Sequence, residues 1–393
     1  MVKIMIKFYK YILLVIISIV LNAVMAEPYI PAFENTVVRV FSASEDVQKI
    51  NYLREQLLID KNNYQILNEA VALYLKMGRE KSDPRYFGYA EALLLPYLNN
   101  KNLPEQVYIH WADVLQHRHE FSQALLVLNR LSNNNSDNPQ VYLMRAISHI
   151  SRAEYQLALD NCKSLFIRAS HLISMACVSQ VKSLSGELQK SFSLLEETLK
   201  INKHSDEEEL GWVITLLADM AVRKGDDFVG EQYYRKALEI NQYDYYALAN
   251  YADLLLKQKK YKQAIFLLNE FTYVDALLLR LAIAGVKTKN DSAAKYIAEL
   301  ESSYRLMELR GEDVHLRDQA RFYFEVKNEN EKALMLAKKN WRIQKEPADI
   351  KLLLDIALKN NNKIELKRGI EWAASQSLED VQLKRIISAA VKL

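Results

Sequence analysis

A spacing of 34 residues recurs along this chain of 393 residues and constrains its fold more than any other feature. The small residues Ala218 and Gly230 return 34 positions later as Ala252 and Ala264. A second pair of windows repeats a larger set at the same distance: Tyr108, Ala112, Phe121 and Ala124 recur as Tyr142, Ala146, Tyr155 and Ala158. A fixed period of this length is typical of arrays in which one supersecondary unit is stacked many times.

The composition indicates that the repeating unit is made of helices. Half of the residues are hydrophobic, which is enough for a continuous core. Only nine glycines and seven prolines are present. A sandwich or barrel of many strands, with a turn about every ten residues, needs more turn residues than this. The sequence therefore predicts an all-α fold.

The stretch from residue 245 to 271 shows what the unit contains. Its small and large apolar residues fall at helical spacing on two helices: Leu248, Tyr251, Ala252 and Leu255 on the first, and Tyr261, Ala264, Leu268 and Phe271 on the second. This pattern resembles the tetratricopeptide repeat family, whose 34-residue unit is two antiparallel helices with small residues where they cross. The resemblance implies a helical solenoid, a right-handed superhelix of antiparallel helix pairs. Similar units start near Glu105, Pro139, Leu172, Gly211, Tyr245 and Asp275.

The same patterns divide the chain into segments. We predict a signal peptide at 1–26, an extended segment at 27–45, a cap helix with a divergent repeat at 46–104 and the repeat array at 105–304. Divergent repeats follow at 305–376, and a capping helix at 377–393 closes the stack. In the divergent part, Arg321 stands where the family usually has a small residue.

The first 26 residues carry the features of a secretory signal peptide. Three lysines precede an apolar run from residue 11 to 20, and Val24, Met25 and Ala26 form a small-residue cleavage site. We therefore expect an exported bacterial protein of the periplasm, with no stable membrane span after cleavage. An uncleaved amino-terminal anchor is the alternative.

The charge balance argues against a nucleic-acid partner. The formal net charge is +3, and the signal segment holds three lysines and no acid, which leaves the rest of the chain neutral. A basic footprint for a polyanion is therefore not expected.

The resemblance also implies where a partner would bind, because first helices line the concave face of such arrays. The residues at these groove positions are polar or aromatic: Asp113, Gln116, His117, Gln180, Asp219, Arg223, Tyr246, Asn250, Asp253 and Lys257. Opposite charges mixed with amides and a tyrosine fit a peptide or helix better than a polyanion. Any one of these residues could equally be part of a solvated helix surface.

The two cysteines and the histidines have structural interpretations. Cys162 and Cys177 lie equally far from a predicted inter-repeat turn, so they could form a disulfide in an oxidising compartment. Two small buried hydrophobic residues are the alternative. His117 and His119 point about 200° apart on a helix, which argues against a metal site that they would share with His110 and His149. We expect no metal and no cofactor.

No catalytic motif is present. A serine elbow, a phosphate loop, H-E-x-x-H, paired C-x-x-C and a dinucleotide glycine fingerprint are all missing. We therefore expect a non-enzymatic scaffold or assembly factor of the cell envelope that binds a protein or peptide on the concave face. One alternative is a periplasmic binding protein for a small molecule, metal or glycan, with a pocket of Trp111, Tyr142, Trp212 and Tyr246. Another is a membrane-tethered assembly factor.

Overall fold

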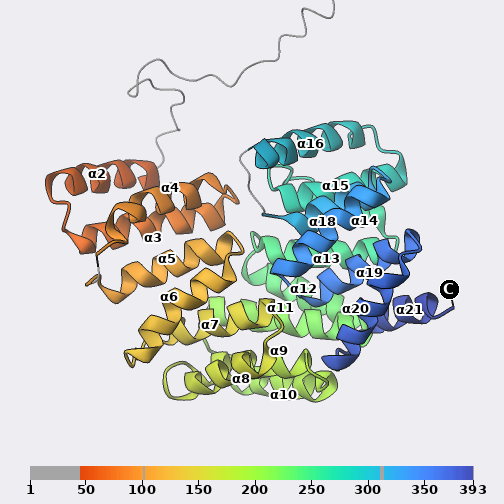
Figure 1. Ribbon diagram of the computed structural model, residues 1–393, viewed down its shortest axis with the longest axis horizontal. Coiled ribbons are helices and arrows are strands. Elements are labelled where there is room, and N and C mark those ends of the chain that lie inside the picture. Colours follow the sequence, from red (N-terminus) through yellow and green to blue (C-terminus); the bar gives the residue numbers. More distant parts are fainter. Residues whose placement is uncertain (1–44, 101, 310–313, 393) are drawn as a thin grey trace, which may run out of the picture. The chain divides into compact units, whose positions relative to one another are not determined.

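The computed structural model describes residues 45–100, 102–309 and 314–392, and all regular structure in these ranges is helical (Figure 1). The chain divides into two units, Met1–Asn51 and Tyr52–Leu393. The predicted signal peptide and nearly all of the predicted extended segment lie outside the described residues. Helix α2 (Glu45–Ile59) begins in the first unit.

The second unit is a succession of helix pairs that follow one another from α3 to α20 (Figure 1). The bounds of the pairs are α3 (Tyr64–Glu80) and α4 (Arg85–Leu94); α5 (Glu105–His117) and α6 (Phe121–Asn133); α7 (Pro139–Ser151) and α8 (Tyr155–Ser164); α9 (His171–Ser183) and α10 (Leu188–Ile201); α11 (Glu207–Lys224) and α12 (Asp227–Ile240); α13 (Tyr245–Lys257) and α14 (Tyr261–Leu268); α15 (Asp275–Thr288) and α16 (Ala293–Leu309); α17 (Leu316–Glu325) and α18 (Asn330–Ile343); and α19 (Pro347–Lys359) and α20 (Lys363–Ser375). Short 3₁₀ turns η1 (Leu95–Tyr97) and η2 (Leu165–Ile167) follow α4 and α8, and α21 (Val381–Ala390) ends the array.

Small residues twelve positions apart lie buried in most of the pairs, one on each helix. The sets are Gly78 and Ala90, Ala112 and Ala124, Ala146 and Ala158, Ser179 and Ser191, Ala218 and Gly230, Ala252 and Ala264, and Ala357 and Gly369. A side-chain carbon added to Gly230 would come within 2.6 Å of Val222 Cγ2. The two helices are therefore too close at this position for a larger residue, as ridges-into-grooves packing requires.

The turn inside each pair is short and has a recurring backbone geometry. Three residues separate α5 from α6, and His119 in this turn has φ of 60°. The Glu120 amide then donates to the Leu115 carbonyl at 2.8 Å, which closes the end of α5. The turns at Gly186 and Gly225 take φ of 90° and 91°, which glycine adopts without strain. These turns set the angle at which each second helix returns.

The divergent repeat at α17 and α18 differs from the sequence prediction in register. The fully buried small residue of α17 is Ala320, and Arg321 lies beside it with 16% of its side chain exposed. Arg321 instead donates to Asp253 and Glu325 at 2.6 and 2.5 Å. The small residue that the helix crossing needs is therefore present one position earlier.

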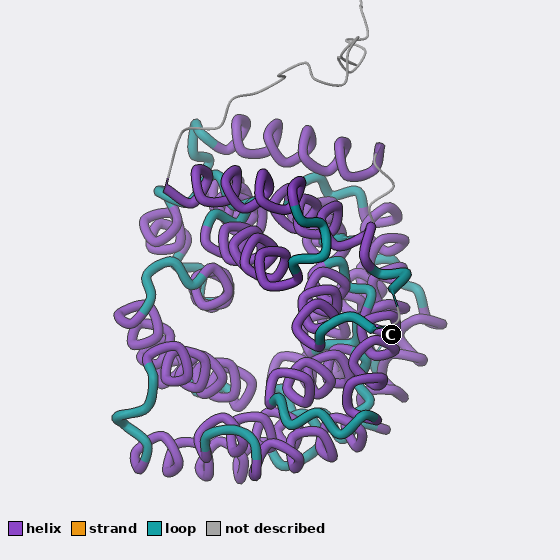
Figure 2. The backbone as a smooth tube through the Cα atoms, turned by 90° about the vertical axis from the view of Figure 1, so that its left-hand side faces the viewer, coloured by secondary structure: helices purple, strands orange, loops and turns teal. Residues whose placement is uncertain are grey.

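The predicted all-α fold of antiparallel helix pairs is confirmed. Figure 2 shows helices joined by loops, with no strand in the part of the chain that the structure describes. Each helix of a pair contacts its partner, and each pair contacts the next. Among the described residues, no helix has both the length and the apolar character needed to cross a membrane.

Candidate functional site

The ten predicted groove residues all lie on first helices, and we call the surface they form the first-helix face. Asp113, Gln116 and His117 are on α5, Gln180 is on α9, Asp219 and Arg223 are on α11, and Tyr246, Asn250, Asp253 and Lys257 are on α13. Successive first helices from α5 to α13 contact one another. The structure thus aligns these residues along one series of neighbouring helices.

Tyr246 is the most exposed of the ten, with 60% of its surface accessible. Its hydroxyl donates to Asp219 Oδ2 at 2.8 Å, across from α13 to α11. One turn further along α13, the Asn250 side-chain amide donates to the Tyr246 carbonyl at 3.1 Å. The tyrosine ring is therefore held at its polar end while much of its surface is left open.

Asp219 is held in place by two tyrosines. The Tyr234 hydroxyl donates to Asp219 Oδ1 at 2.5 Å, and Tyr246 occupies the other carboxylate oxygen. Burial raises the pKa of Asp219, although the two hydroxyl hydrogen bonds oppose that shift. The negative charge of Asp219 in turn raises the pKa of Tyr246, so the phenol remains a hydrogen-bond donor at neutral pH.

Asp253 belongs to an ion-pair network that sequence reasoning did not find. Arg280 Nη2 and Arg321 Nη1 donate to its two carboxylate oxygens at 2.8 and 2.6 Å. Arg280 also lies 3.3 Å from Asp318. Burial alone would raise the pKa of Asp253, but the two arginines outweigh burial and lower it. The partners come from α15 and α17, and no local spacing links them to Asp253.

Most of the other predicted groove residues interact with neighbouring repeats. The Gln116 amide donates to the Met144 carbonyl and to Ser148 Oγ, each at 2.7 Å. The His117 ring stacks on Phe87, with ring centroids 3.4 Å apart. Their contacts are those of side chains that join one repeat to the next.

The charged members of the set also have partners within the array. Asp113 pairs with Arg79, Lys257 Nζ lies 2.6 Å from Asp227 Oδ1, and Gln180 is half-buried. Arg223 is 8% exposed and donates to the Ser183 carbonyl and hydroxyl at 2.8 and 2.6 Å. Within the first-helix face, Tyr246 is therefore the residue with the most open surface, and Asn250, one turn away, is half-buried.

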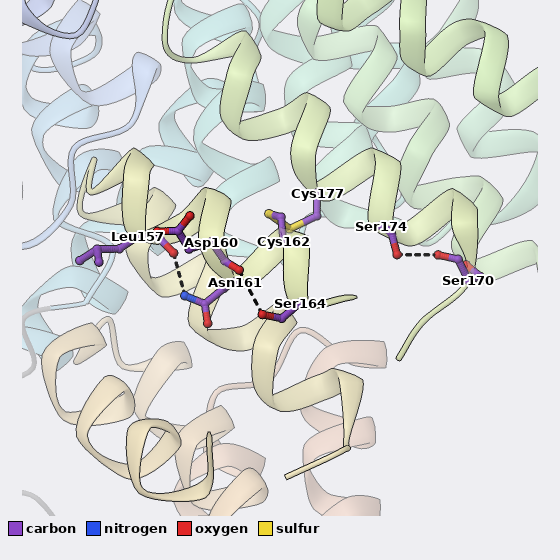
Figure 3. Close-up of a disulfide and its surroundings, with 8 residues drawn as sticks. All are labelled: Leu157, Asp160, Asn161, Cys162, Ser164, Ser170, Ser174 and Cys177. Atoms are coloured by element: carbon purple, nitrogen blue, oxygen red, sulfur yellow. Dashed lines mark hydrogen bonds between the residues drawn. A yellow bond between two sulfur atoms is a disulfide. The ribbon is translucent and has the colours of Figure 1, made fainter. Parts of the chain in front are cut away.

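The two cysteines form a disulfide between α8 and α9 (Figure 3). The Cα atoms of Cys162 and Cys177 are 5.4 Å apart, and both residues are almost completely buried. Figure 3 also shows the Asn161 amide bonded to the Leu157 carbonyl within α8. The disulfide therefore joins two successive repeats.

The histidines do not form a metal centre in the described part of the chain. No group of three or more histidine, cysteine, aspartate or glutamate side chains is arranged to hold a metal ion there. Burial is the main cause that lowers the pKa of His117 to about 3 and that of His119 to about 4. The His119 ring lies near that of His315, the residue before α17, with ring centroids 6.3 Å apart. The imidazoles of His117 and His119 are therefore uncharged at neutral pH.

Of the four aromatic residues expected to form the alternative small-molecule pocket, Tyr142 is buried. Tyr142 is 8% exposed, the Arg168 guanidinium lies 4.5 Å from its ring, and its hydroxyl donates to the Ser136 carbonyl at 2.9 Å. A groove of about 690 Å³ is found elsewhere, over α18 and the turn between α19 and α20. It is lined by Glu331, Leu334, Met335, Lys338, Lys339, Arg342, Asn360 and Asn362 and contains none of the predicted groove residues.

Comparisons with known proteins give only partial likenesses of fold. No family model matches the chain, and no curated protein matches it. Similar solved structures include Pseudomonas aeruginosa PilF, at 17% identity and a TM-score of 0.38, covering 51% of this chain and 92% of that one. They also include the Cut9–Hcn1 hetero-tetramer of APC/C, at 12% identity and a TM-score of 0.47, covering 88% of this chain and 73% of that one. The human IFIT1 dimer with m7Gppp-AAAA gives 15% identity and a TM-score of 0.46, covering 88% and 86%.

The TM-scores of these three structures are all below 0.5, so they say nothing about function. The fold assignment rests on the helix pairs and on the small residues at their crossings. Those features confirm the tetratricopeptide resemblance at the level of the fold.

Proposed function

We propose that this array of tetratricopeptide-type helix pairs is a non-enzymatic scaffold or assembly factor of the bacterial cell envelope. In this proposal it binds a peptide or helix of a partner protein on the first-helix face, at Tyr246 and Asn250. The predicted signal peptide supports a periplasmic location. The polar and charged character of the face supports a protein partner.

The arrangement of Tyr246 is the observation that carries the proposal. Large aromatic side chains supply much of the energy at protein interfaces, especially when they are ordered before binding. The hydrogen bond to Asp219 orders this side chain, and 60% of its surface remains accessible. A partner that covers the ring therefore buries apolar surface, and little side-chain conformational entropy is lost because the tyrosine is already ordered.

The surroundings of Tyr246 favour a particular kind of partner. Asn250 offers an amide next to the ring, and Asp253 lies one turn further along the same helix between two arginines. Acidic and basic groups thus balance along α13 and α17. An extended segment or helix with one apolar side chain for the ring and polar neighbours for the amide fits this surface better than a strongly charged polymer.

Co-purification with matched variants tests the proposal. The full chain is purified from its own envelope in three forms: wild type, Tyr246→Ala and Phe266→Ala. Phe266 lies on second helix α14 and is 81% exposed, so it controls for loss of any exposed aromatic residue. We expect one protein to accompany the wild type and Phe266→Ala, and to fall by about tenfold or more with Tyr246→Ala, as at an interface hot spot. Equal recovery with both variants would reject the proposed site.

The compartment needs a separate measurement. The mature protein is isolated from the envelope and its intact mass is determined. If the segment ending at Ala26 is removed, we expect the mass of a chain that begins at Glu27. Retention of residues 1–26 would replace the soluble periplasmic proposal with a membrane-tethered assembly factor.

A further inference from the structure

One side of α18 lines a groove that is separate from the first-helix face. The groove has a volume of about 690 Å³, and we call it the α18 groove. Its lining residues on α18 recur at spacings of three and four, which places them on one side of the helix. They are Glu331, Leu334, Met335, Lys338, Lys339 and Arg342, and the turn between α19 and α20 completes the lining with Asn360 and Asn362. Because α18 is a second helix, none of its residues belongs to the first-helix face.

Hydrogen bonds fix the turn that borders the α18 groove. Asn360 Nδ2 donates to the Asn330 carbonyl, at the start of α18, at 2.9 Å. Asn362 Oδ1 accepts from the Glu365 amide at 3.1 Å and so caps α20. The groove is therefore formed before a ligand binds, which lowers the entropy lost on binding.

An ion pair joins α18 to α20 beside the groove. Lys338 Nζ lies 2.9 Å from Glu365 Oε1, and Glu365 is 7% exposed. Arg368 Nη1 lies 3.5 Å from the same oxygen. Lys338 therefore holds the two helices together, and the cations that can meet a ligand are the other two of the lining.

Arg342 is the cation that most favours an anionic ligand. It is exposed and forms no hydrogen bond or ion pair with another residue in the part of the chain that the structure describes. Lys339 is also exposed and lies one turn earlier on the same side of α18. Glu331, the acid of the lining, is about three turns from Arg342. A guanidinium pairs with a carboxylate through two parallel hydrogen bonds, so this end of the groove attracts carboxylates.

The middle of the groove offers an apolar contact. Met335 is 60% exposed, and Leu334 beside it is half-buried. Methionine adapts to apolar side chains of different shapes. Lys339 and Arg342 follow Met335 by four and seven residues, which is roughly 6 to 10 Å along the helix. A ligand that fills the groove therefore needs an apolar group and, one to two turns away, negative charge.

These features favour a peptide over other anionic ligands. A concave groove does not match a flat lipid surface. A nucleic acid would need phosphate-binding cations along its whole length, and Glu331 would repel it at one end. A segment of protein chain can carry apolar side chains and carboxylates at the spacing that α18 presents.

We propose that the α18 groove binds an acidic peptide segment of a partner protein. An apolar side chain of the segment lies over Leu334 and Met335, and its carboxylates pair with Lys339 and Arg342. The site lies on other helices than Tyr246, so it does not depend on the function proposed for the first-helix face.

Binding of labelled peptides to the full chain tests the role of charge. Two peptides of glutamate and leucine are used, one with leucines at helical spacing and one with alternating leucines. Their counterparts carry glutamine in place of glutamate. We expect at least one acidic peptide to bind, and its counterpart to bind about tenfold more weakly. No binding of either acidic peptide, or equal binding of the counterparts, would overturn the proposal.

Matched variants locate the binding. The groove variant combines Lys339→Gln with Arg342→Gln. The control combines Lys190→Gln with Lys295→Gln, two lysines of α10 and α16 whose side chains are 77% and 74% exposed. We expect the groove variant to bind the acidic peptide about tenfold more weakly, and the control to change by less than about twofold. Equal weakening would reject the site.

A second pair of variants tests the apolar contact. Met335→Gln should weaken binding by about threefold or more, because an apolar contact is lost. Ile364→Gln is the control, since Ile364 on α20 is 71% exposed and does not line the groove. Circular dichroism checks that each variant keeps its helices. Equal affinity of wild type and Met335→Gln would contradict the proposed position of the apolar side chain.

Other occupants of the groove are outcomes of the same test. Vesicles of phosphatidylglycerol that bind wild type but not the groove variant, with no binding of the peptides, would replace the peptide by a lipid surface. Self-association in sedimentation equilibrium that the groove variant abolishes would replace it by a second copy of the chain. Tyr246→Ala should leave peptide binding unchanged, so failure of the first-helix site and failure of the α18 groove are distinguishable.

Discussion

Small buried residues determine how closely the two helices of each repeat approach. Gly230 and Gly88 provide a direct comparison, because a methyl group on Gly230 would meet Val222 at 2.6 Å while one on Gly88 would meet nothing within 4 Å. We predict that Gly230→Ala lowers the free energy of unfolding by about 1–3 kcal/mol through overpacking. Gly88→Ala, within helix α4, should be neutral or stabilising by up to about 1 kcal/mol. Urea unfolding of both variants checks the prediction, and equal effects would contradict it.

Buried histidines should make the fold sensitive to acid. The pKa values of His117 and His119 lie at about 3 and about 4, below their ordinary value of 6.5, mainly because of burial. Between pH 6.5 and about 4 the unfolded chain takes up protons that the folded chain does not. The free energy of unfolding therefore decreases as the pH falls through this window.

A histidine variant isolates that contribution. We predict that His119→Gln unfolds with a weaker pH dependence than wild type between pH 6.5 and 4. His171→Gln serves as the control, because His171 is exposed at the start of α9. Urea midpoints at several pH values across the window provide the measurement. Parallel pH profiles for wild type and His119→Gln would show that the buried imidazole does not titrate as described.

Asp355 should act in the opposite sense. Burial raises its pKa from 3.8 to about 6, and the charge of Glu325 adds to the shift. The folded chain therefore binds a proton at Asp355 at a higher pH than the unfolded chain does. Protonation of Asp355 stabilises the fold increasingly as the pH falls from about 6 towards 4. We predict that Asp355→Asn is more stable than wild type at pH 7.5 and that the difference shrinks by pH 4. A difference that does not change with pH would contradict this.

The sequence predicted which residues lie on the first-helix face, but not what they contact. All ten are on first helices, as the repeat spacing implies. Their hydrogen-bond partners are far away in the sequence: Arg321 is 68 residues from Asp253, and Ser183 is 40 residues from Arg223. A periodic pattern carries no information about pairs at such separations, so exposure at Tyr246 had to come from the structure.

At the scale of helices, the repeat spacing predicted helix pairs along most of the chain, including the pair α9 and α10. Ser179 and Ser191 occupy the same crossing in α9 and α10, and serine does not distinguish a buried crossing from a polar surface. In α17 the alanine is shifted by one position to Ala320. Element type was therefore predictable along the array, whereas the register of α17 was not, because its small residue is shifted by one position.

The disulfide between α8 and α9 should stabilise two successive repeats against separation. Cys162 and Cys177 enclose a loop with a sequence separation of 15. Closing a loop of this length stabilises by about 3 kcal/mol in the chain-entropy model. We predict that reduction lowers the free energy of unfolding by about 2–4 kcal/mol. Urea unfolding with and without reductant checks this, and the double variant Cys162→Ala with Cys177→Ala should not respond to reductant.

At the scale of the second unit, the contacts that no repeat pattern encodes are those between its late and early repeats. Glu379 meets Leu188, and Lys345 meets Ser151, through single hydrogen bonds. A family resemblance implies how neighbouring repeats stack, but it does not imply which distant turns touch. Stacking was therefore predictable from the sequence, and these contacts between distant repeats were not.

The central claim is that a protein partner contacts the first-helix face beside Tyr246. Photo-crosslinking in living cells tests it most directly, with a probe at Asn250 on α13 and a control probe at the exposed Lys262 on α14. We predict that the Asn250 probe captures a defined envelope protein and that the Lys262 probe does not. Capture of the same proteins at equal yield from both positions, or no capture from either while the chain is folded and exported, would contradict the claim.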